Sequence, residues 1–290
     1  MSQKPGWARR MAAWPRFLLG RGNDAGQLYD LRGAGAIEGA GDTPLVNMGY
    51  WAEVSPRGAD ALQKACYALF DLVADGAGLD AAEAHVLDAG CGFGTNACHI
   101  VERFGSAWVT GVNVSAVQLA IARDRAALAG VDGKVNFLLA SVTDLPVATG
   151  SMDAVVSVEA AFHFDTREQF FAEAFRVLKP GGRLSMVDLV VPPAHRWWHA
   201  PALDLVCRSQ AVPRANIYDL AGWMQRLRAA GFEVMEEESI VDRVFPAFRR
   251  WMLTRPPHVH LRYDLMYIVA SLPYLVYPFD YVRVVARKPG

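Results

Sequence analysis

His85-Val-Leu-Asp-Ala-Gly-Cys-Gly-Phe-Gly-Thr95 is the stretch that decides the fold of this chain of 290 residues. A short apolar run ends in Asp88, and three glycines then alternate with other residues before a helical pattern begins at Thr95. Glycine lets the backbone turn sharply and lets a ligand lie against it without a Cβ clash. Enzymes that bind dinucleotides space these glycines as GxGxxG, whereas the spacing here is GxGxG. The stretch therefore predicts a strand, a ligand-binding loop and a helix, with a ligand other than a dinucleotide.

Apolar runs alternate with amphipathic segments on both sides of this loop. Helices are predicted at residues 58–73, 95–104, 115–128, 167–178 and 218–230. Strands are predicted at residues 86–87, 108–112, 135–139, 154–158, 184–190, 232–241 and 281–286. The Lys179-Pro-Gly-Gly182 sequence is expected to end a helix and to form a turn. Because short strands that alternate with helices form parallel βαβ units, we expect an α/β fold with a doubly wound, mostly parallel, seven-stranded Rossmann-like sheet.

Three segments depart from this alternation. Residues 1–57 are expected to form an N-terminal lid or cap, and residues 58–290 the main domain. Two insertions in that domain, at about residues 192–216 and 243–278, are rich in aromatic side chains, and residues 194–213 are expected to be irregular. Doubly wound sheets bind ligands at the carboxyl ends of their strands, so we expect the insertions to form a helical and aromatic cap over that edge.

The composition favours a small-molecule partner. The net charge is -1, so the chain lacks the excess of Lys and Arg that binds nucleic acid phosphates. Its four cysteines are scattered and show no zinc-ligand spacing, which predicts a reducing, cytoplasmic setting and no metal site. No apolar run reaches the roughly 18 residues that a transmembrane helix needs.

The first segment admits two interpretations. Residues 7–19 mix aromatic side chains with arginines, and no acidic residue occurs before Asp24. Helical spacing would place much of the aromatic material opposite the arginines, which is typical of a helix docked on its own domain or of one that lies on a membrane surface. A peripheral membrane contact and a homo-oligomer are both compatible with the sequence.

Four further motifs occur in order around the glycine loop. They are Asn47-Met-Gly-Tyr-Trp51, Gly111-Val-Asn-Val-Ser-Ala-Val-Gln118, Ala140-Ser-Val-Thr-Asp-Leu-Pro146 and Arg176-Val-Leu-Lys-Pro-Gly-Gly182. Together with the loop they resemble the nucleotide-binding region of class I S-adenosylmethionine (SAM)-dependent methyltransferases. The resemblance is to the small-molecule branch, which contains sterol, tocopherol and ubiquinone-type C-methyltransferases and natural-product sugar O-methyltransferases. It covers about half of the chain and implies SAM as the cofactor and a small, largely apolar substrate.

The resemblance also implies which residues hold SAM. Asp88 would orient the loop and the methionine amine. Asn113 stands where many members of the family have an acid for the ribose hydroxyls, with Gln118 as a second candidate, and Ser141 stands where an acid often lies near the adenine. The complete implied set is Tyr50, Trp51, Asp88, Gly90, Gly92, Asn113, Val114, Gln118, Ser141, Val142 and Glu159.

The catalytic candidates are His163, Asp188 and Glu159, which follow or end the fourth and fifth predicted strands. His163 matches a catalytic histidine of the sugar O-methyltransferases, and Asp188 matches an acid that partners it. An acid in that position fixes the tautomer of the histidine and raises its basicity. The implied function is O-methylation of an apolar natural product or lipid-like metabolite with His163 as general base. C-methylation of an isoprenoid or another electron-rich alkene or ring, with Glu159 stabilising a carbocation, stays open, as does a SAM-binding partner protein without catalysis.

Overall fold

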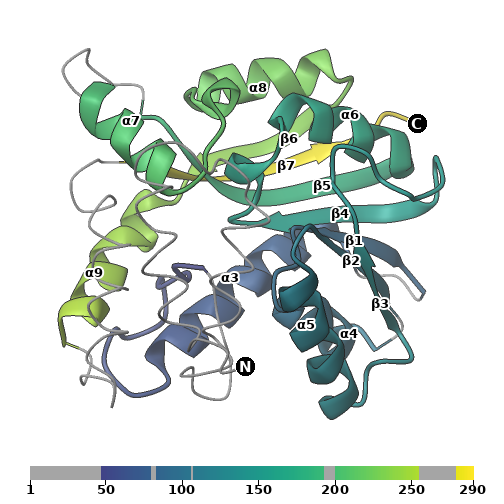
Figure 1. Cartoon of the computed structure of the whole chain (residues 1–290), viewed down its shortest axis with the longest axis horizontal. Helices are drawn as coiled ribbons and strands as arrows, with labels where there is room; N and C mark the ends of the chain where they lie inside the picture. Colours follow the sequence, from purple (N-terminus) through teal and green to yellow (C-terminus); the bar gives the residue numbers. More distant parts are fainter. Residues whose placement is uncertain (1–46, 80–82, 106, 193–199, 255–278) are drawn as a thin grey trace, which may run out of the picture.

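The computed structural model describes residues 47–79, 83–105, 107–192, 200–254 and 279–290, which form a seven-stranded sheet flanked by helices (Figure 1). The strands are β1 (His85–Ala89), β2 (Trp108–Asn113), β3 (Val135–Leu139), β4 (Met152–Val158), β5 (Leu178–Val190), β6 (Glu233–Ser239) and β7 (Asp280–Arg287). Their order is β3-β2-β1-β4-β5-β7-β6. Neighbours from β3 to β5 are parallel, and β7 is antiparallel to β5 and to β6. The expected doubly wound, mostly parallel sheet is confirmed.

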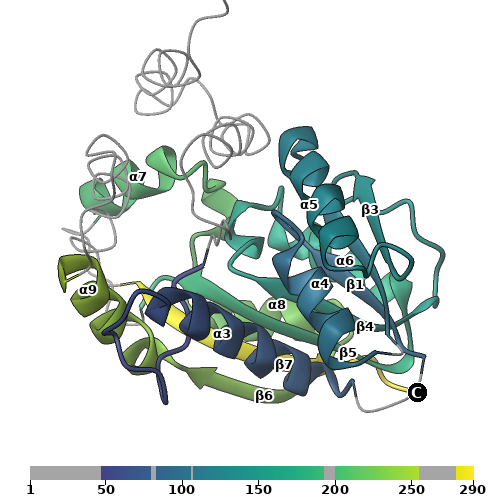
Figure 2. The same cartoon turned by 90° about the horizontal axis from the view of Figure 1, so that it is seen from below.

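Helices cover both faces of the sheet. One face carries α3 (Ala61–Ala77), α4 (Thr95–Arg103) and α5 (Ala116–Leu128), and the other carries α6 (Arg167–Val177) and α8 (Leu220–Ala229), as Figures 1 and 2 show. At the side of the molecule where β5 ends lie α7 (Ala200–Ser209) and α9 (Phe245–Thr254) (Figure 1). In the part of the chain that the structure describes, 3-10 turns occur at η1 (Ala161–His163), η3 (Arg214–Asn216) and η4 (Val241–Arg243). This arrangement leaves the carboxyl ends of β4 and β5 next to α7.

Burial differs between the middle of the sheet and its β6 edge. The central strands β1 and β4 are mostly buried, and β5 is buried along its whole second half, as expected for strands covered by helices on both faces. The edge strand β6 is mostly exposed instead, and its Glu233 and Glu236 form ion pairs with Arg287 and Arg283 of β7. Charged side chains on an edge strand disfavour pairing with another chain, which suits its place at the border.

The Lys179-Pro-Gly-Gly182 segment differs from the expected turn. The helix before it ends at Val177, one residue earlier than predicted, and β5 begins directly at Leu178. The pairing with β4 jumps from Met152↔Leu178 to Ala154↔Arg183, so the four residues between bulge out of the ladder. Gly181 permits this because its positive φ of 80° costs glycine little.

Both predicted insertions contain a regular helix. Residues 200–209 form α7, which corrects the expectation of an irregular segment. Leu203 and Cys207 of α7 are four residues apart and pack in one small apolar cluster, and Pro201 lies in the first turn, where a missing N–H is tolerated. Residues 193–199 and 255–278 of the two insertions lie outside the described residues, as do residues 1–46 of the expected N-terminal lid (1–57), which include the possible membrane helix. In the described part of the chain, no helix combines the length and the apolar character needed to cross a membrane.

Candidate active site

The glycine loop joins β1 to α4 in a tight turn held against β2. The N–H groups of Gly90 and Cys91 both donate to the carbonyl of Val112, at 2.9 and 3.1 Å. Gly90 has a φ of 78°, and Gly94, the N-cap of α4, has a φ of 72°. A Cβ on Gly90 would lie 2.5 Å from the Cβ of Ala160, which follows β4. Both backbone conformation and space therefore require glycine at this position.

Gly90→Ala is expected to lower the free energy of unfolding by about 1–3 kcal/mol more than Gly130→Ala, because overpacking adds to the strain of a left-handed alanine. Gly130 is the matched control, since it also has a positive φ (68°) but nothing lies within 4 Å of its Cβ position. Urea unfolding of the two variants measures the difference. The double variant Gly90→Ala, Ala160→Gly is expected to recover most of the lost unfolding free energy. Equal losses in Gly90→Ala and Gly130→Ala would show that the contact with Ala160 is not the cause.

Asp88 is buried at the end of β1, beside the start of α4. Burial raises the pKa of its carboxyl group from 3.8 to about 7, and the nearby Asn96 side chain and Ala97 backbone N–H oppose that rise. Within the described residues, its Oδ2 atom has no hydrogen-bond partner. Because a buried acceptor without a partner is costly, this oxygen is suited to accept a hydrogen bond from a ligand.

Asn113 and Gln118 bind each other at the end of β2. The Nδ2 atom of Asn113 donates to Oε1 of Gln118 at 2.8 Å and to the carbonyl of Gly92 at 3.3 Å. Its Oδ1 atom accepts from the backbone N–H groups of Val114 and Ser115. The Asn113 amide thus ties the glycine loop to the start of α5, a role that the sequence did not predict. Nε2 of the buried Gln118 has no hydrogen-bond partner among the described residues, so it retains a donor for a ligand.

Ser141 and Val142 follow β3, near the expected adenine side. Oγ of Ser141 lies 2.7 Å from Oγ1 of Thr143 and accepts a hydrogen bond from the Thr143 backbone N–H. Val142 is buried in the core on the α6 face, and the side chain of Val114, after β2, is exposed. Ser141 therefore stabilises a local turn, and its contact with adenine stays a prediction.

Tyr50 and Trp51 belong to the Asn47–Trp51 segment, which packs between α3 and η4. The Tyr50 N–H donates to the carbonyl of Ala65 at 2.8 Å, and the Tyr50 hydroxyl accepts from Nη1 of Arg243 at 3.2 Å. The Trp51 N–H donates to the carbonyl of Arg243 at 2.9 Å, and the Trp51 side chain is buried in the core. The segment is fixed by these bonds, and its expected closure over a cofactor stays a prediction.

Glu159 follows β4 with a positive φ of 47°. Its Oε1 atom accepts from the backbone N–H of Met48 at 2.6 Å and from the hydroxyl of Tyr281 in β7. Burial raises its pKa from 4.5 to about 7; the two hydrogen bonds oppose this rise, and the charge of Asp188 adds to it. Glu159 therefore links the N-terminal segment to the two strands that border the site.

His163 is the last residue of η1, the turn that follows β4, so it comes after the fourth strand as expected. Its side chain is buried, and its ring lies against the ring of Phe162 with centroids 3.9 Å apart. The His163 backbone N–H donates to the carbonyl of Ala160 at 3.0 Å. The histidine thus occupies a short turn at the carboxyl edge of the sheet, where doubly wound folds bind ligands.

Asp188, near the end of β5, pairs with Arg167, the first residue of α6. Its Oδ2 atom accepts from Nε and Nη2 of Arg167 at 3.1 and 3.0 Å, and both side chains are fully buried. A buried guanidinium requires a carboxylate close by, so the partner that the structure gives to Asp188 Oδ2 is Arg167. The expected pairing of Asp188 with His163 stays a prediction. Burial raises the pKa of Asp188 from 3.8 to about 6, and Arg167 opposes the rise.

The protein is expected to be more stable near pH 5.5 than near pH 8. The folded-state pKa values of Asp88, Glu159 and Asp188 are about 7, 7 and 6, all above their ordinary values because of burial. A raised folded pKa contributes stability at low pH that is lost as pH rises through that pKa, because the folded state holds the proton more tightly. Thermal unfolding between about pH 5 and pH 8 measures the slope. Glu159→Gln is expected to make the slope shallower, and the same slope in this variant would rule out Glu159 as a source.

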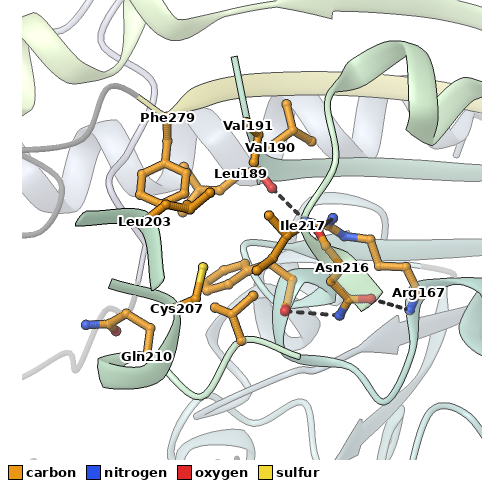
Figure 3. Close-up of a pocket in the computed structure, with 12 residues that line it drawn as sticks. Arg167, Leu189, Val190, Val191, Leu203, Cys207, Gln210, Asn216, Ile217 and Phe279 are labelled. Atoms are coloured by element: carbon orange, nitrogen blue, oxygen red, sulfur yellow. Dashed lines mark hydrogen bonds between the residues drawn. The ribbon is translucent and has the colours of Figure 1, made fainter. Parts of the chain in front are cut away.

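An apolar pocket lies between the end of β5 and α7 (Figure 3). Its apolar lining consists of Phe162, Leu189, Val190, Val191, Leu203, Cys207, Val212, Ile217 and Phe279, and its polar lining of Arg167, Gln210 and Asn216. Arg167 and Asn216 lie side by side and are joined by a hydrogen bond (Figure 3). Because Phe162 directly precedes His163, the pocket wall and the histidine belong to one turn.

Known proteins of similar sequence carry a common domain. Residues 87–186 match the family described as "Methyltransferase domain". The chain is 38% identical to methyltransferase GfsG of Streptomyces halstedii over 169 residues, and this match spans 58% of each protein. It is 30% identical to erythromycin 3''-O-methyltransferase of Saccharopolyspora erythraea over 270 residues, 84% of each protein. The chain belongs to the SAM-dependent methyltransferases.

Solved structures share the fold of this methyltransferase. The 4+2 cyclase SpnF is 29% identical, with a TM-score of 0.72 over 92% of this chain and 96% of that one. A geranyl diphosphate methyltransferase in complex with SAM is 20% identical, with a TM-score of 0.69 over 84% of this chain and 100% of that one. The cofactor of the present methyltransferase is SAM. The residues around the glycine loop fit this ligand: Asp88 Oδ2 at the end of β1 offers an acceptor and Gln118 Nε2 in α5 a donor, both buried and without partners among the described residues.

Sequence reasoning missed Arg167, Asn216 and Tyr281 in the methyltransferase. Arg167 carried one signal: a positive charge in the first turn of a helix opposes the helix dipole, so its presence there suggests a specific partner. Asn216 and Tyr281 carried none, because their partners in η1 and after β4 are 50 or more residues away along the chain.

Proposed function

We propose that this methyltransferase methylates a hydroxyl group of a small, largely apolar natural product or lipid-like metabolite, with His163 as the general base. The observation that carries the proposal is the shared turn of His163 and Phe162, which joins a buried imidazole to the wall of the apolar pocket. An acceptor in this pocket would lie at the carboxyl ends of β4 and β5, next to the glycine loop after β1.

The first cofactor contacts are assigned to buried polar atoms that have no hydrogen-bond partner among the described residues. Oδ2 of Asp88 would accept from the methionine ammonium group, and Nε2 of Gln118 would donate to the ribose. Asn113 would act through the loop that it holds at Gly92. The proposed contact set is completed by Tyr50, Trp51, Gly90, Gly92, Val114, Ser141, Val142 and Glu159.

The chain contributes positioning, exclusion of water and a proton acceptor. SAM, when bound, supplies an electrophilic methyl group on its sulfonium. The lining of the pocket excludes water and limits the orientations of the acceptor. The imidazole of His163 would take the hydroxyl proton as the new O–C bond forms and the bond between that methyl carbon and sulfur breaks, with S-adenosylhomocysteine as the leaving group.

The hydrogen bonds of Glu159 favour O-methylation over C-methylation. A carbocation mechanism needs this carboxylate for stabilisation and proton transfer. Its Oε1 atom already accepts hydrogen bonds from Met48 and Tyr281, which tie it to the N-terminal segment and to β7. The similarity to erythromycin 3''-O-methyltransferase, whose name specifies oxygen as the acceptor atom, supports the same choice.

The test is S-adenosylhomocysteine release from SAM over a panel of phenols, sugars, polyketides and prenyl compounds, after calorimetry has established SAM binding. SAM with a deuterated methyl group labels the product, and NMR of that product distinguishes a methyl ether from a new C–CH3 bond. We expect turnover with an apolar hydroxyl compound and a methyl ether as product. A C-methylated product would overturn the proposal, and SAM binding without release on any compound would favour a non-catalytic SAM-binding partner protein.

A further inference from the structure

Asn216 connects the segment after α7 to the turn that carries His163. Its Nδ2 atom donates to the carbonyls of Phe162 and Phe164, at 3.1 and 2.7 Å. Its Oδ1 atom accepts from the backbone N–H of Arg167 at 2.9 Å, and the side chain is buried. An asparagine amide offers two N–H donors and one carbonyl oxygen, so all three polar groups of this side chain are engaged.

The two carbonyls that Asn216 binds lie on either side of His163 in the sequence. Turns of the 3-10 type have weak internal hydrogen-bond geometry, so the position of η1 depends on such outside contacts. The backbone carbonyl of Asn216 also accepts from Nη1 of Arg167 at 2.7 Å, and that guanidinium binds Asp188. It also donates to the carbonyl of Leu189 (Figure 3). Through these bonds the turn of His163 is fixed to the end of β5.

The same segment of chain forms part of the apolar pocket. Asn216 and Ile217 line it together with Phe162 of η1 and with Leu203 and Cys207 of α7. The Asn216 side chain therefore links two parts of the site. It fixes the position of the pocket wall formed by the insertion relative to the turn that contains His163.

We propose that Asn216 is a positioning residue, which sets the place of the His163 imidazole relative to a molecule bound in the apolar pocket. The inference rests on the proposed function where it takes His163 as the base. Asn216 acts through the backbone of η1.

Two substitutions separate its contacts. Asn216→Asp keeps the size and the oxygen that accepts from the Arg167 N–H, but it replaces the donor to the Phe162 and Phe164 carbonyls with an oxygen. Asn216→Ala removes all three contacts. If the alanine variant does not fold, Asn216→Ser is used in its place. Leu227→Ala is the control for destabilisation alone, since Leu227 is buried in α8 and its side chain has no hydrogen-bonding atom.

The direct readout is the NMR signal of the His163 ring in full-length protein labelled with nitrogen-15 histidine and saturated with S-adenosylhomocysteine. Loss of one set of signals in His163→Ala assigns the residue. We expect the His163 signals to shift or broaden in the Asn216 variants and to stay in place in Leu227→Ala. Unchanged His163 signals in the Asn216 variants, or an equal change in Leu227→Ala, would overturn the inference.

The second readout is turnover with the acceptor found in the panel. Both Asn216 variants are expected to lower kcat by about tenfold or more while KM for SAM changes by less than about twofold, since positioning acts on the chemical step. If His163→Ala reduces turnover but the Asn216 variants keep their kcat, the inference fails and the proposed function stands. If His163→Ala keeps full turnover, the base assignment fails, and the NMR result alone decides whether Asn216 positions the turn.

Discussion

Arg167→Ala is expected to lower the free energy of unfolding by about 3–5 kcal/mol, the cost of leaving a buried charge without its partner. Arg167 and Asp188 are fully buried, and Nε and Nη2 of Arg167 both donate to Oδ2 of Asp188. The guanidinium also donates to the carbonyls of Leu189 and Asn216, at 2.6 and 2.7 Å. The alanine variant leaves these acceptors unpaired, and equilibrium unfolding in urea measures the loss.

The double variant Arg167→Met, Asp188→Leu distinguishes the buried charge from packing as the cause. Replacing both ions with apolar side chains of similar volume removes the uncompensated carboxylate, so we expect most of the lost stability to return. Packing of the Arg167 guanidinium against the rings of Tyr218 and Trp223, at 5.1 and 5.4 Å from their centroids, limits the recovery. If the double variant is as unstable as Arg167→Ala, the penalty comes from lost packing and not from the Asp188 charge.

The fold was predictable because its signals are local. The run from His85 to Thr95 contains the apolar strand, the glycines with positive φ and the helix start, and each of these depends on neighbours a few residues away. The same holds for Ala116–Leu128, where Ser115 accepts from the Gln118 N–H and marks the helix start. The predicted turn at Lys179–Gly182 is instead a bulge within β5. The local sequence did not indicate this, because the bulge depends on pairing with β4, which is distant in sequence.

The candidate site was predictable only in part, because its pairings are long-range. The positions of Asp88 and Asp188 near strand ends, and of His163 in the turn after β4, follow from the alternation of strands and helices. The partner of Asp188 did not follow, since a single sequence shows a carboxylate and several cations but not which of them is buried beside it. Asn113 shows the same limit: the resemblance implied a ribose contact, whereas the structure adds a bond to Gly92 that stabilises the loop.

His163→Ala is expected to lower kcat by about 10²–10⁴-fold on a hydroxyl acceptor, the range that general-base groups contribute. SAM affinity measured by calorimetry is expected to change little, because His163 lies in η1 and the glycine loop follows β1. The wild-type rate is expected to fall in acid, because a protonated imidazole cannot accept the hydroxyl proton, and the residual rate of the variant should lack this dependence. His99→Ala is the matched control, since His99 is a partly buried histidine whose Nε2 binds Asp71 on the α3–α4 face of the sheet. A kcat for His163→Ala equal to that of His99→Ala would show that positioning and desolvation carry the reaction without a base at this turn.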